Sequence, residues 1–533
     1  MSIDATLITP TPPDISAFGI RSISSFLRQN GCNTRLIFLP GSIGLLKEGG
    51  KYVYAYDKTV IDDITALCSQ SSLIGISFMS SYFDRAVQIA QALKKTLNIP
   101  LIMGGIHPSC KPQEALKYAD MACVGEGEEA LLELLNNMKT QKNHRTVQGI
   151  WFKDNGNIIK NNVRALIKNL DSLPFFDYSN KEHYIYNKKT GHIEELNDTF
   201  FKETLPLLPS LNGSIKRAYR TMTDRGCPHK CSYCNISNLK RIYEDDTTPY
   251  FRARSVDSVI AELTDMKSRF PFVEAVQFFD DTFFARPFKQ IEDFSIKYKE
   301  KIILPFYVQA SPTTLTEDKL TTLIDAGLVF IEMGIQTGSE KIKKLYRRQE
   351  SNEKIIEGTK IINKYKEKLI IPDYHIIIDN PWEDETDTMD TVKLLYNIPK
   401  PFGLCISSLV FFPGTDLYEK AVTEGLIKDE ISDVYRKPFY MAPQKTYSNF
   451  LIYLLTFQHF PRPLLSLLVN RKAAKTASKL NLSPLFGLSY KVGEGVRFLA
   501  KVYSTLKRRD WRRIKLFINA IIEKDPVVAG RKS

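Results

Sequence analysis

The chain has 533 residues, of which 43% are hydrophobic and 25% are charged, and its formal net charge is +13. This length is too great for one hydrophobic core, and the composition is that of a globular protein rather than a disordered or fibrous one. The charge is uneven, because residues 431–533 carry +15 and residues 1–430 carry −2. The basicity is therefore local and is not that of a generally cationic protein. The first residues lack a basic leader, so we expect a cytoplasmic protein.

Residues 1–144 are predicted to form the first domain. Short apolar runs alternate there with segments of helical period, which is typical of a parallel α/β sheet wrapped by helices. The expected strands are Ala5–Thr9, Thr34–Leu39, Leu73–Phe78, Pro100–Met103 and Met121–Val124, with helices over 81–97 and 127–138. In such Rossmann-like sheets, ligands bind beyond the carboxyl ends of the strands.

Small and polar residues follow these strands. They include Asp14, Ser16 and Gly19 after the first strand, Ser77 after the third, Gly104 and Gly105 after the fourth, and Gly125 after the fifth. Paired glycines allow a bulky ligand to approach the backbone. The patterns Asp-x-Ser-x-x-Gly, Ser-x-Met and Gly-Gly resemble those of the cobalamin-binding domains, in which the first pattern is Asp-x-His-x-x-Gly.

This resemblance implies cobalamin as a cofactor, with contacts from Asp14, Ser16, Ser77, Gly104, Gly105 and Gly125. Ser16 stands where the family has the histidine that binds cobalt, so no imidazole from this motif is expected on the metal. A domain that kept the fold but lost the ligand is the alternative. His107, in the glycine-rich loop, is expected to pack or cap there rather than to bind a metal.

Residues 145–214 are predicted to be a connector without chemistry. Trp151 and Phe152, followed by the Asn155-Gly156 turn, predict a β-hairpin. The segment from Leu173 to Tyr178 is expected to be extended, because proline disfavours helix in the residue before it.

Three of the eight cysteines, Cys227, Cys231 and Cys234, fall within eight residues. Three thiolates on a short loop can bind three irons of a [4Fe–4S] cluster and leave the fourth iron open to a small molecule. The Cys-x-x-x-Cys-x-aromatic-Cys pattern, with Tyr233 as the aromatic residue, resembles the radical S-adenosylmethionine (radical SAM) superfamily. The resemblance implies that SAM binds the open iron and is cleaved reductively to a 5′-deoxyadenosyl radical, with Tyr233 beside the cofactor.

The alternative for these cysteines is a structural zinc site with His229 or a distant residue as fourth ligand. Structural zinc sites usually have paired Cys-x-x-Cys or Cys/His elements, and no second pair occurs in this chain. The other five cysteines are scattered and are expected to be buried, reduced thiols.

Residues 215–430 are predicted to form a radical SAM partial (β/α)6 barrel. The expected strands are Ala218–Thr223, Ala275–Phe279, Pro305–Gln309, Val329–Gly334, Tyr374–Ile378 and Cys405–Phe411, with helices such as 256–270 and 353–365 between them. In barrels of this kind, active sites form at the carboxyl ends of the strands.

The barrel motifs resemble the SAM-binding segments of the superfamily. Asp280 and Asp281 follow the second strand, where the family often has Gly-Gly-Glu, and either carboxylate can accept hydrogen bonds from the SAM ammonium. Carboxylates that merely cap the next helix are the alternative. Gln336 and Ser339 lie in Gly-Ile-Gln-Thr-Gly-Ser, which resembles the family's Gly-Ile-Glu-Ser-Gly-Ser near the SAM ribose and carboxylate. The fifth and sixth strands end in Asp-Asn-Pro-Trp-Glu-Asp-Glu-Thr and Phe-Pro-Gly-Thr, the first of which departs from the usual Gly-x-Pro-x-Glu-Thr.

Residues 431–533 are predicted to be a basic helical region. The apolar stretch 450–469 contains two prolines, an arginine and a histidine, which argue against a membrane-spanning helix. Residues 495–524 alternate apolar side chains with Lys and Arg as basic amphipathic helices do. Such helices can pack on the core with a solvated basic face, lie on an anionic membrane surface, or bind nucleic acid, which is the least favoured of the three.

These resemblances predict a cobalamin-dependent radical SAM enzyme, with methylation of an unactivated carbon as the favoured reaction. They also cover cyclases and rearranging enzymes of the same architecture. A methylthiotransferase acting on RNA or protein, with a second cluster, is a further alternative, and so is a non-enzymatic zinc protein. The expected partners are a small-molecule or lipid substrate and an external one-electron reductant such as flavodoxin or ferredoxin.

Overall fold

The computed structural model describes residues 3–10, 16–39, 45–48, 51–437, 446–458, 460–470 and 482–507. Asp14 and the predicted tail helices beyond residue 507 lie outside the described residues. The chain divides into two compact units, and each is described here by itself. The first unit comprises residues 1–206, 220–262 and 410–438, and the second comprises residues 207–219, 263–409 and 439–533.

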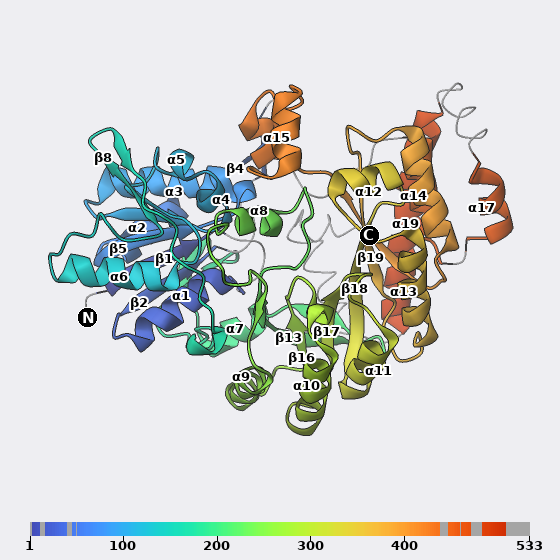
Figure 1. The fold of residues 1–533 in the computed structure, drawn as a ribbon, viewed down its shortest axis with the longest axis horizontal. Helices are drawn as coiled ribbons and strands as arrows, with labels where there is room; N and C mark the ends of the chain where they lie inside the picture. Colours follow the sequence, from blue (N-terminus) through green and yellow to red (C-terminus); the bar gives the residue numbers. More distant parts are fainter. Residues whose placement is uncertain are drawn as a thin grey trace. The chain divides into compact units, whose positions relative to one another are not determined.

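The first unit is built on a nine-stranded sheet in the order β11-β10-β2-β1-β5-β6-β7-β8-β9 (Figure 1). Its strands are β1 (Ile3–Thr9), β2 (Thr34–Phe38), β5 (Ser71–Ser77), β6 (Leu101–Gly104), β7 (Met121–Cys123), β8 (Ile150–Asp154), β9 (Asn157–Ile159), β10 (His183–Asn187) and β11 (His192–Glu195). The central strands β2, β1, β5, β6 and β7 run parallel. The predicted parallel sheet is confirmed, and every residue of β1 is buried at its centre.

Helices cover this sheet, and each of the longer ones packs on it through a face on which its apolar residues recur. They are α1 (Phe18–Gln29), α2 (Lys58–Cys68), α3 (Phe83–Thr96), α4 (Ile106–Cys110), α5 (Pro112–Ala115) and α6 (Glu128–Lys139). In α3, Phe83, Ala86, Ile89, Ala90 and Leu93 are buried, at the spacing of an amphipathic helix. A separate hairpin pairs β3 (Leu45–Glu48) with β4 (Lys51–Tyr54), which the sequence did not predict.

The segment predicted as a connector contributes four strands to this sheet. The expected hairpin forms as β8 and β9, and β8 continues the sheet antiparallel to β7. On the opposite edge, β10 pairs with β2 and β11 pairs with β10. Helix α7 (Asp198–Thr204) follows, and its N-cap Asn197 accepts a hydrogen bond from the Phe200 backbone N–H.

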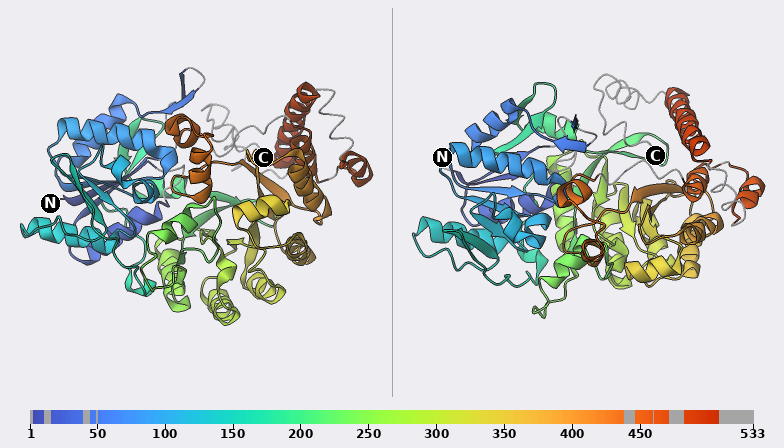
Figure 2. Two further views of the ribbon diagram at one scale, coloured as in Figure 1. Left: turned by 45° about the horizontal axis from the view of Figure 1, so that its top comes forward. Right: turned by 90° about the horizontal axis from the view of Figure 1, so that it is seen from above.

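The second unit contains a seven-stranded sheet in the order β12-β13-β16-β17-β18-β19-β20, which curves into an open barrel (Figure 2). Its strands are β12 (Leu207–Pro209), β13 (Ile215–Thr221), β16 (Ala275–Phe278), β17 (Phe306–Ala310), β18 (Leu328–Gln336), β19 (Asp373–Ile378) and β20 (Gly403–Ser408). Strands β16 to β20 run parallel, and all six predicted strands are present. The antiparallel strand β12 was not predicted.

Helices line the outer side of the barrel strands (Figure 1). They are α10 (Phe288–Lys301), α11 (Glu317–Ala326), α12 (Glu340–Tyr346), α13 (Asn352–Lys364) and α14 (Glu385–Asn397). Helix α9 (Val256–Arg269) begins in the first unit and ends in the second. The C-terminal region adds α16 (Tyr447–Leu455), α17 (Arg462–Leu468) and α19 (Ser483–Lys507). Within the stretches given above, no helix has both the length and the hydropathy needed to cross a bilayer.

Candidate functional site

The carboxyl edge of the nine-stranded sheet brings the glycine-rich and serine motifs together. In the order β2-β1-β5-β6-β7, the chain leaves β1 toward β2 on one side and later returns to β5 on the other side of β1. The strand order therefore reverses between β1 and β5, and ligands of such sheets bind in the crevice at the carboxyl ends of the two strands at this point. Ser77 ends β5 and pairs in register with Gly104 at the end of β6. Ser16 lies after β1, is 9% exposed, and is separated from the start of α1 by the N-cap Ala17.

Gly105 is required by the backbone around it. Its φ is +96°, and a Cβ there would lie 2.8 Å from the Phe78 carbonyl oxygen and 3.0 Å from the Ser77 Oγ. A Cβ on Gly104 would meet only the Cβ of Cys123, at 3.6 Å, which is an ordinary contact. The glycine at position 105 is therefore explained by the neighbouring backbone, and the two glycines present no side chain at the carboxyl edge of the sheet, which is compatible with the close approach of a large ligand such as cobalamin.

Gly125 has a different explanation. Its φ is +92°, and a Cβ there would lie 2.3 Å from the hydroxyl of Tyr243. That hydroxyl also accepts a hydrogen bond from the Glu126 backbone N–H at 2.8 Å. Tyr243 belongs to the segment that follows the three cysteines, so Gly125 makes room for a side chain of the protein itself.

His107 is buried and packs as predicted. Its ring stacks on Phe78, with 5.2 Å between the ring centroids, and its Nδ1 lies 3.0 Å from the Ser80 Oγ. Its Nε2 is 3.4 Å from Glu114, which also accepts a hydrogen bond from the Tyr435 hydroxyl at 2.5 Å. Burial alone would raise the pKa of Glu114, but the hydrogen bonds from His107 and Tyr435 outweigh it and lower that pKa.

The three cysteines lie on the loop that joins β14 (Asp224–Arg225) to α8 (Asn235–Arg241). Cys231 is buried, Cys227 and Cys234 are partly buried, and none of the three is in a disulfide. The Cys234 backbone N–H donates to the Cys231 carbonyl at 3.2 Å, and Cys234 is the N-cap of α8. Tyr233 is partly buried on the same turn.

The start of this loop is fixed by glycine. Gly226 has a φ of +82°, and a Cβ there would lie 2.4 Å from the Tyr250 carbonyl oxygen. Only glycine tolerates that approach in this conformation. The residue before Cys227 is thus held against the backbone of the strand-like segment that leads to β15 (Arg252–Ala253), which pairs antiparallel with β14.

Buried ion pairs tie the cysteine loop to the nine-stranded sheet inside the first unit. Arg225 is paired with Glu126 at 3.1 Å and with Glu128, whose side chain is 4% exposed. Arg252 donates to Glu126 at 2.7 Å. Glu128 also accepts from Ser22 on α1, at 2.6 Å. Glu128 and Arg252 are buried, with side chains 4% and 6% exposed, whereas Arg225 and Glu126 are partly buried. Buried charges are stable only when paired, so these contacts fix the loop on the segment that follows β7.

The Phe-Pro-Gly-Thr segment lies against the other side of the cysteine loop in the same unit. Asn238 on α8 donates to the Pro413 carbonyl at 3.3 Å and to the Cys110 Sγ at 3.1 Å. The Leu417 backbone N–H, at the start of α15 (Asp416–Thr423), donates to the Ser232 carbonyl at 3.2 Å. This segment is therefore part of the support of the cysteine loop.

The donor set of the loop fits an iron–sulfur cluster. Thiolates are the ligands that such clusters prefer, and three of them leave one iron open. Among the residues that the structure describes, no group of three or more His, Cys, Asp or Glu side chains is gathered into a metal-binding geometry. The assignment of the three thiols rests on their type, spacing and absence of disulfides.

In the second unit, Asp280 and Asp281 follow β16 but have different environments. Asp280 is fully buried, and its carboxylate lies 3.3 Å from the Arg286 guanidinium. Asp281 is exposed on the surface of its own unit. Although the residue is exposed as a whole, protein atoms crowd around its carboxyl, and this loss of water, followed by the charge of Asp280, raises the pKa of Asp281 to about 7. Asp280 is thus already paired within the fold, whereas Asp281 is the carboxyl available to a ligand.

Two neighbouring barrel strands end in strained residues. Gln336 at the end of β18 has a φ of +69°, and Asp379 just after β19 has a φ of +58°. The left-handed conformation costs a residue with a Cβ about 1 kcal/mol or more, and such strain is common at functional sites. The Gln336 amide folds back over Gly334, where a Cβ would lie 2.7 Å from its Nε2. Asp379 accepts from Ser408 and Asn449, both at 2.9 Å.

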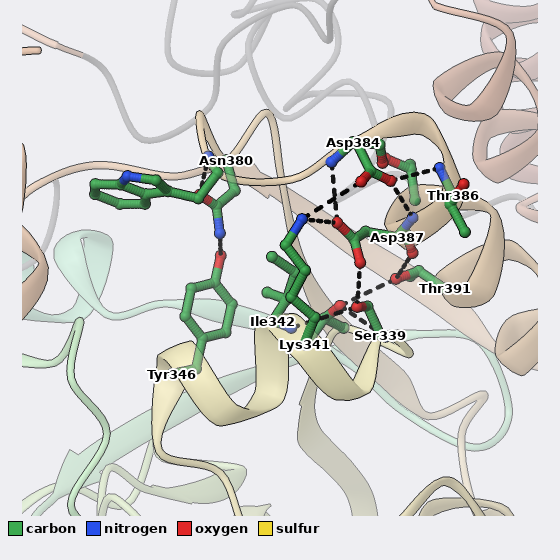
Figure 3. A network of polar contacts seen from close by, with 12 residues as sticks. Ser339, Lys341, Ile342, Tyr346, Asn380, Asp384, Thr386, Asp387 and Thr391 are labelled. Carbon is green, nitrogen blue, oxygen red and sulfur yellow. Dashed lines mark hydrogen bonds and ion pairs between the residues drawn. The ribbon is translucent and has the colours of Figure 1, made fainter.

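Ser339 is engaged in a structural network (Figure 3). It is the N-cap of α12, where its Oγ accepts from the Ile342 backbone N–H. The same hydroxyl donates to Asp387 on α14 at 2.7 Å, and Asp387 is also paired with Lys341 at 2.7 Å. Ser339 is 1% exposed, so its predicted contact with SAM has to compete with these bonds.

Sequence reasoning missed several residues of these regions. Arg225 lies about a hundred positions from its partners Glu126 and Glu128. The one sequence signal for this contact is that Arg225 stands two residues before Cys227 and that the two glutamates stand beside the Gly125 motif. Glu383, after β19, was quoted only as part of a motif. Burial, with the charges of Asp387 and Asp379, raises the pKa of Glu383 to about 8.

Two family models match the chain. The model of the radical SAM superfamily covers residues 223–392, and the model of the B12 binding domain covers residues 5–135. Together they include the cysteine loop, most of the barrel, and the carboxyl edge of the nine-stranded sheet.

Two methyltransferases are similar over most of the chain. An uncharacterized methyltransferase of Pyrococcus horikoshii is 23% identical over 362 residues, which are 67% of this chain and 70% of that protein. The bacteriochlorophyllide d C-8(2)-methyltransferase of Chlorobaculum tepidum is 21% identical over 389 residues, 68% of this chain and 71% of that protein.

Solved structures share the fold. The radical SAM methyltransferase TsrM from Kitasatospora setae, with cobalamin and a [4Fe–4S] cluster bound, superposes with a TM-score of 0.59 at 14% identity, over 80% of this chain and 75% of that chain. The cobalamin-dependent radical enzyme OxsB, without ligands, gives a TM-score of 0.61 at 15% identity, over 96% of this chain and 71% of that chain.

Proposed function

Because the chain belongs to the radical SAM enzymes that carry a B12-binding domain, we propose that it transfers a methyl group to an unactivated carbon of its substrate. The cofactors of this family are a [4Fe–4S] cluster, SAM and cobalamin. When bound, the cluster supplies the electron that cleaves SAM to a 5′-deoxyadenosyl radical, and cobalamin supplies the methyl group. The observation that carries the proposal is the buried ion-pair network that joins the cysteine loop to the cobalamin-type sheet in one compact unit.

The residues have separate roles in this proposal. Cys227, Cys231 and Cys234 bind three irons, and Tyr233 packs beside the open one. Gly104 and Gly105, with Ser77, receive the corrin and its tail at the carboxyl edge of the sheet. Ser16 leaves cobalt without an imidazole from this motif.

In the barrel, Asp281 and Gln336 are proposed to bind SAM. Asp281 is exposed, whereas Asp280 is already paired with Arg286. The strained backbone at Gln336 holds its amide at the carboxyl end of β18. Ser339 acts by fixing the start of α12 on Asp387 rather than by touching SAM.

The experiment is anaerobic reconstitution of the full chain with iron, sulfide and cobalamin, followed by assay with SAM and dithionite. We expect about four irons, one extractable corrinoid per chain, and formation of 5′-deoxyadenosine. Replacement of all three loop cysteines by alanine should abolish the iron and the deoxyadenosine. Cys68→Ala is the matched control, because Cys68 is buried and burial raises the pKa of its thiol to about 12.

Each outcome separates the alternatives. About eight irons per chain would favour a methylthiotransferase with a second cluster, and one zinc in a colourless protein would favour a zinc-binding protein. Deoxyadenosine without any corrinoid at stoichiometric loading would contradict the cobalamin part alone. Unchanged deoxyadenosine after loss of the three cysteines would contradict the whole proposal.

Ring closure is the second candidate reaction. The anaerobic magnesium-protoporphyrin IX monomethyl ester cyclase of Synechocystis is 23% identical over 182 residues, 33% of this chain and 32% of that protein. Methyl transfer accounts for the two relatives that match about two thirds of the chain. A product heavier than its substrate by one CH2 group supports methylation, whereas loss of hydrogen without that gain supports cyclisation.

We also infer a peripheral contact with the cytoplasmic face of an anionic membrane through α19. Apolar side chains recur along this helix every three or four residues, and each is 56% to 68% exposed: Leu485, Leu488, Val492, Val496, Leu499 and Tyr503. The +15 charge of residues 431–533 adds attraction to anionic lipid. Cosedimentation with phosphatidylserine vesicles at low salt is expected for the wild type and should be lost in a Leu488→Asp, Val492→Asp variant.

Ile296→Asp is the matched control, because Ile296 is 64% exposed on α10, in another part of the chain. It should leave vesicle binding unchanged. Equal vesicle binding of the wild type and the α19 variant would contradict the inference. It would also be contradicted if, without vesicles, the wild type formed a stable dimer and the α19 variant were monomeric, because α19 would then be a dimer interface.

A further inference from the structure

Helix α4 connects the two candidate cofactor loops of the first unit. It begins directly after Gly105, in the glycine pair proposed to receive cobalamin, and it ends at Cys110. Cys110 lies against α8, the helix whose N-cap is Cys234. The side-chain amide of Asn238, one turn along α8, donates to the Cys110 Sγ at 3.1 Å. A helix of five residues therefore has the glycine pair at one end and the cysteine helix at the other.

Asn238 also contacts a third element. An amide nitrogen carries two hydrogens, and besides its bond to Cys110 the Asn238 Nδ2 donates to the Pro413 carbonyl at 3.3 Å. Gly414 follows with a φ of +81°, and a Cβ there would lie 2.6 Å from the same Nδ2. Glycine at position 414 thus leaves the space that the Asn238 amide fills. The amide is held by two elements outside its own helix.

Pro413 and Gly414 belong to a segment that reaches both loops. We call residues 410–438 the strap segment; it follows β20, contains α15 and belongs to the first unit. Near its start, the Leu417 N–H donates to the carbonyl of Ser232, which lies between two of the loop cysteines, at 3.2 Å. The strap segment is therefore bonded directly to the cysteine loop.

The end of the strap segment is bonded to α4. Tyr435 is 2% exposed, and its ring lies 5.1 Å from the His107 ring between centroids. Its hydroxyl donates to Glu114, which is also 3.4 Å from the His107 Nε2. Lys111, directly after α4, is paired with Glu430 at 3.3 Å. The strap segment thus holds α4 at its middle and at its carboxyl end.

The backbone at this attachment has an uncommon form. Residues Ile431–Tyr435 make a single π-helical turn, η4, in which the Arg436 N–H donates to the Ile431 carbonyl at 2.9 Å. Single π-helical turns are rare and are frequent at functional sites. The Arg436 guanidinium then makes two bonds to the Asp84 carboxylate on α3, at 2.6 and 3.1 Å. Tyr435 and Arg436 therefore leave the turn as a pair of anchors on the nine-stranded sheet domain.

The contacts close a ring within one compact unit. Helix α4 is bonded to Asn238, Asn238 to the strap segment, and the strap segment back to α4 through Tyr435. Energetic coupling between two sites is carried by packed and hydrogen-bonded groups of this kind. A ligand that orders the glycine pair also orders α4 and the ring, so the cysteine loop is held by elements whose ordering cost is already met. Each cofactor should therefore stabilise the binding of the other.

We propose that Asn238 and the strap segment couple the cobalamin site to the iron–sulfur loop, with Asn238 and Tyr435 as positioning residues. This inference rests on the proposed function, because it assigns a regulation of the same two cofactor sites. Cobalamin at the glycine pair stabilises the cysteine loop and protects its cluster. The cluster is then most persistent in chains that also carry the methyl donor.

The test measures how fast bathophenanthroline disulfonate removes iron from the anaerobically reconstituted full chain, with and without saturating hydroxocobalamin. In the wild type, cobalamin should slow the loss of iron about fivefold or more, because coupling between sites commonly has that size. In Asn238→Leu, which has a side chain of similar size but no donor, the slowing should be almost absent. Asn363→Leu is the matched control, because that helical amide also donates to a backbone carbonyl, of Lys400 at 3.0 Å, but in the second unit.

Tyr435→Phe is a milder variant that keeps the ring and removes only the bond to Glu114, so the slowing should be reduced. It decides the result if Asn238→Leu does not retain a cluster. Its control is Tyr118→Phe, because the Tyr118 ring packs on Phe83 in the same aromatic cluster, with 5.8 Å between the centroids. Cobalamin saturation of every variant is checked by equilibrium dialysis.

Equal slowing in the wild type and in either ring variant, Asn238→Leu or Tyr435→Phe, would mean that cobalamin merely covers the cluster, and would overturn the coupling. No slowing in the wild type, or an equal loss of slowing in Asn363→Leu, would overturn it as well. A wild type that binds no cobalamin or no cluster contradicts the proposed function and the inference with it. Binding of both cofactors without coupled protection overturns the inference alone.

Discussion

In the first unit, Glu126 is paired with two guanidinium groups, whereas Asp373 in the second unit lies beside another carboxylate, Glu332. Burial alone would raise the pKa of both groups. Arg225 and Arg252 outweigh burial at Glu126 and lower its pKa, while Glu332 adds to burial and raises the pKa of Asp373.

Other residues of each unit follow the same contrast. Asp177 in the first unit accepts from Ser24 at 2.6 Å and is paired with Arg28 at 3.1 Å and with His183 at 3.2 Å, and these partners hold its pKa well below the usual range. Around the barrel, Asp281 and Glu383 have pKa values raised to about 7 and about 8. In the first unit, Glu126 and Asp177 are paired with cationic side chains that lower their pKa. In the barrel, several carboxyls have a raised pKa, so the fold favours their neutral form.

The difference indicates two kinds of role. Matched charges hold the cysteine loop on the nine-stranded sheet and need no ligand to be stable. Carboxyls whose pKa is raised reduce the stability of the fold when they are ionised, and raised pKa values are frequent at functional sites. Substitutions in the two regions should therefore change stability in opposite directions.

Arg225→Met is expected to have the largest effect, because it leaves Glu126 and Glu128 short of a buried cation. Removal of one partner from a buried ion pair costs about 3–5 kcal/mol. The measurement is the free energy of unfolding from denaturant titration, followed by circular dichroism. Lys58→Met is the matched control, since Lys58 is 88% exposed in its ion pair with Asp62, and such pairs contribute about 0–1 kcal/mol. Equal losses in the two variants would remove the contrast between the units.

The sequence predicted the parts of the fold whose signals are local. Period-two and helical patterns predicted the parallel strands β1, β2, β5, β6 and β7 of the first sheet and β16 to β20 of the second, and the Asn155-Gly156 turn predicted the β8–β9 hairpin. The strands β10, β11 and β12 were missed. They are short strands at or next to a sheet edge, and β10 is placed by pairing with β2, which is distant in the sequence. The β3–β4 hairpin was missed as well, although its pairing is local.

The candidate site was predictable to the extent that motifs mark it. The three cysteines and Gly104–Gly105 were proposed from their spacing and from the family resemblance, and their roles stay predictions. The sequence did not reveal that Asp280 pairs with Arg286 or that Ser339 caps α12 and bonds Asp387, because a side chain's partner depends on tertiary packing. Glu332, Asp373 and Gly403 carry no motif, because residues of three different strands meet only through the sheet register.

Ser339→Ala tests a paired position in the barrel unit. It removes the N-cap of α12 and the bond to the buried carboxylate Asp387, so we expect a loss of about 2 kcal/mol. Ser351→Ala is the matched control, because Ser351 caps α13 by accepting from the Lys354 backbone N–H and has an exposed setting. That control should lose about 1 kcal/mol, the value of a cap alone. A smaller loss for Ser339→Ala than for Ser351→Ala would show that the Asp387 bond contributes nothing.

Asp373→Asn should have the smallest effect and the opposite sign. A carboxyl whose folded pKa is raised from 3.8 to about 6 binds its proton more tightly in the folded state. The Asp373 carboxyl therefore does not lower the free energy of unfolding below pH 3.8. It lowers that free energy progressively as the pH rises from 3.8 to 6, and by its full amount above pH 6. Since the residue keeps part of its surface in water, we expect the asparagine variant to gain about 1 kcal/mol in free energy of unfolding at pH 8.

The pH dependence of this gain separates electrostatics from packing. At pH 5 about half of the gain should remain, because Asp373 is then protonated in the folded state but mostly ionised in the unfolded chain. Asp390→Asn, on the outer helix α14 beside Lys393, should change the free energy by less than about 0.5 kcal/mol at either pH. A gain at Asp373 that is equal at pH 5 and pH 8 would mean that asparagine simply packs better, and a loss at pH 8 would mean that the carboxylate is matched by a cation after all. Only a gain that grows with pH shows that the fold opposes the charge of the Asp373 carboxyl.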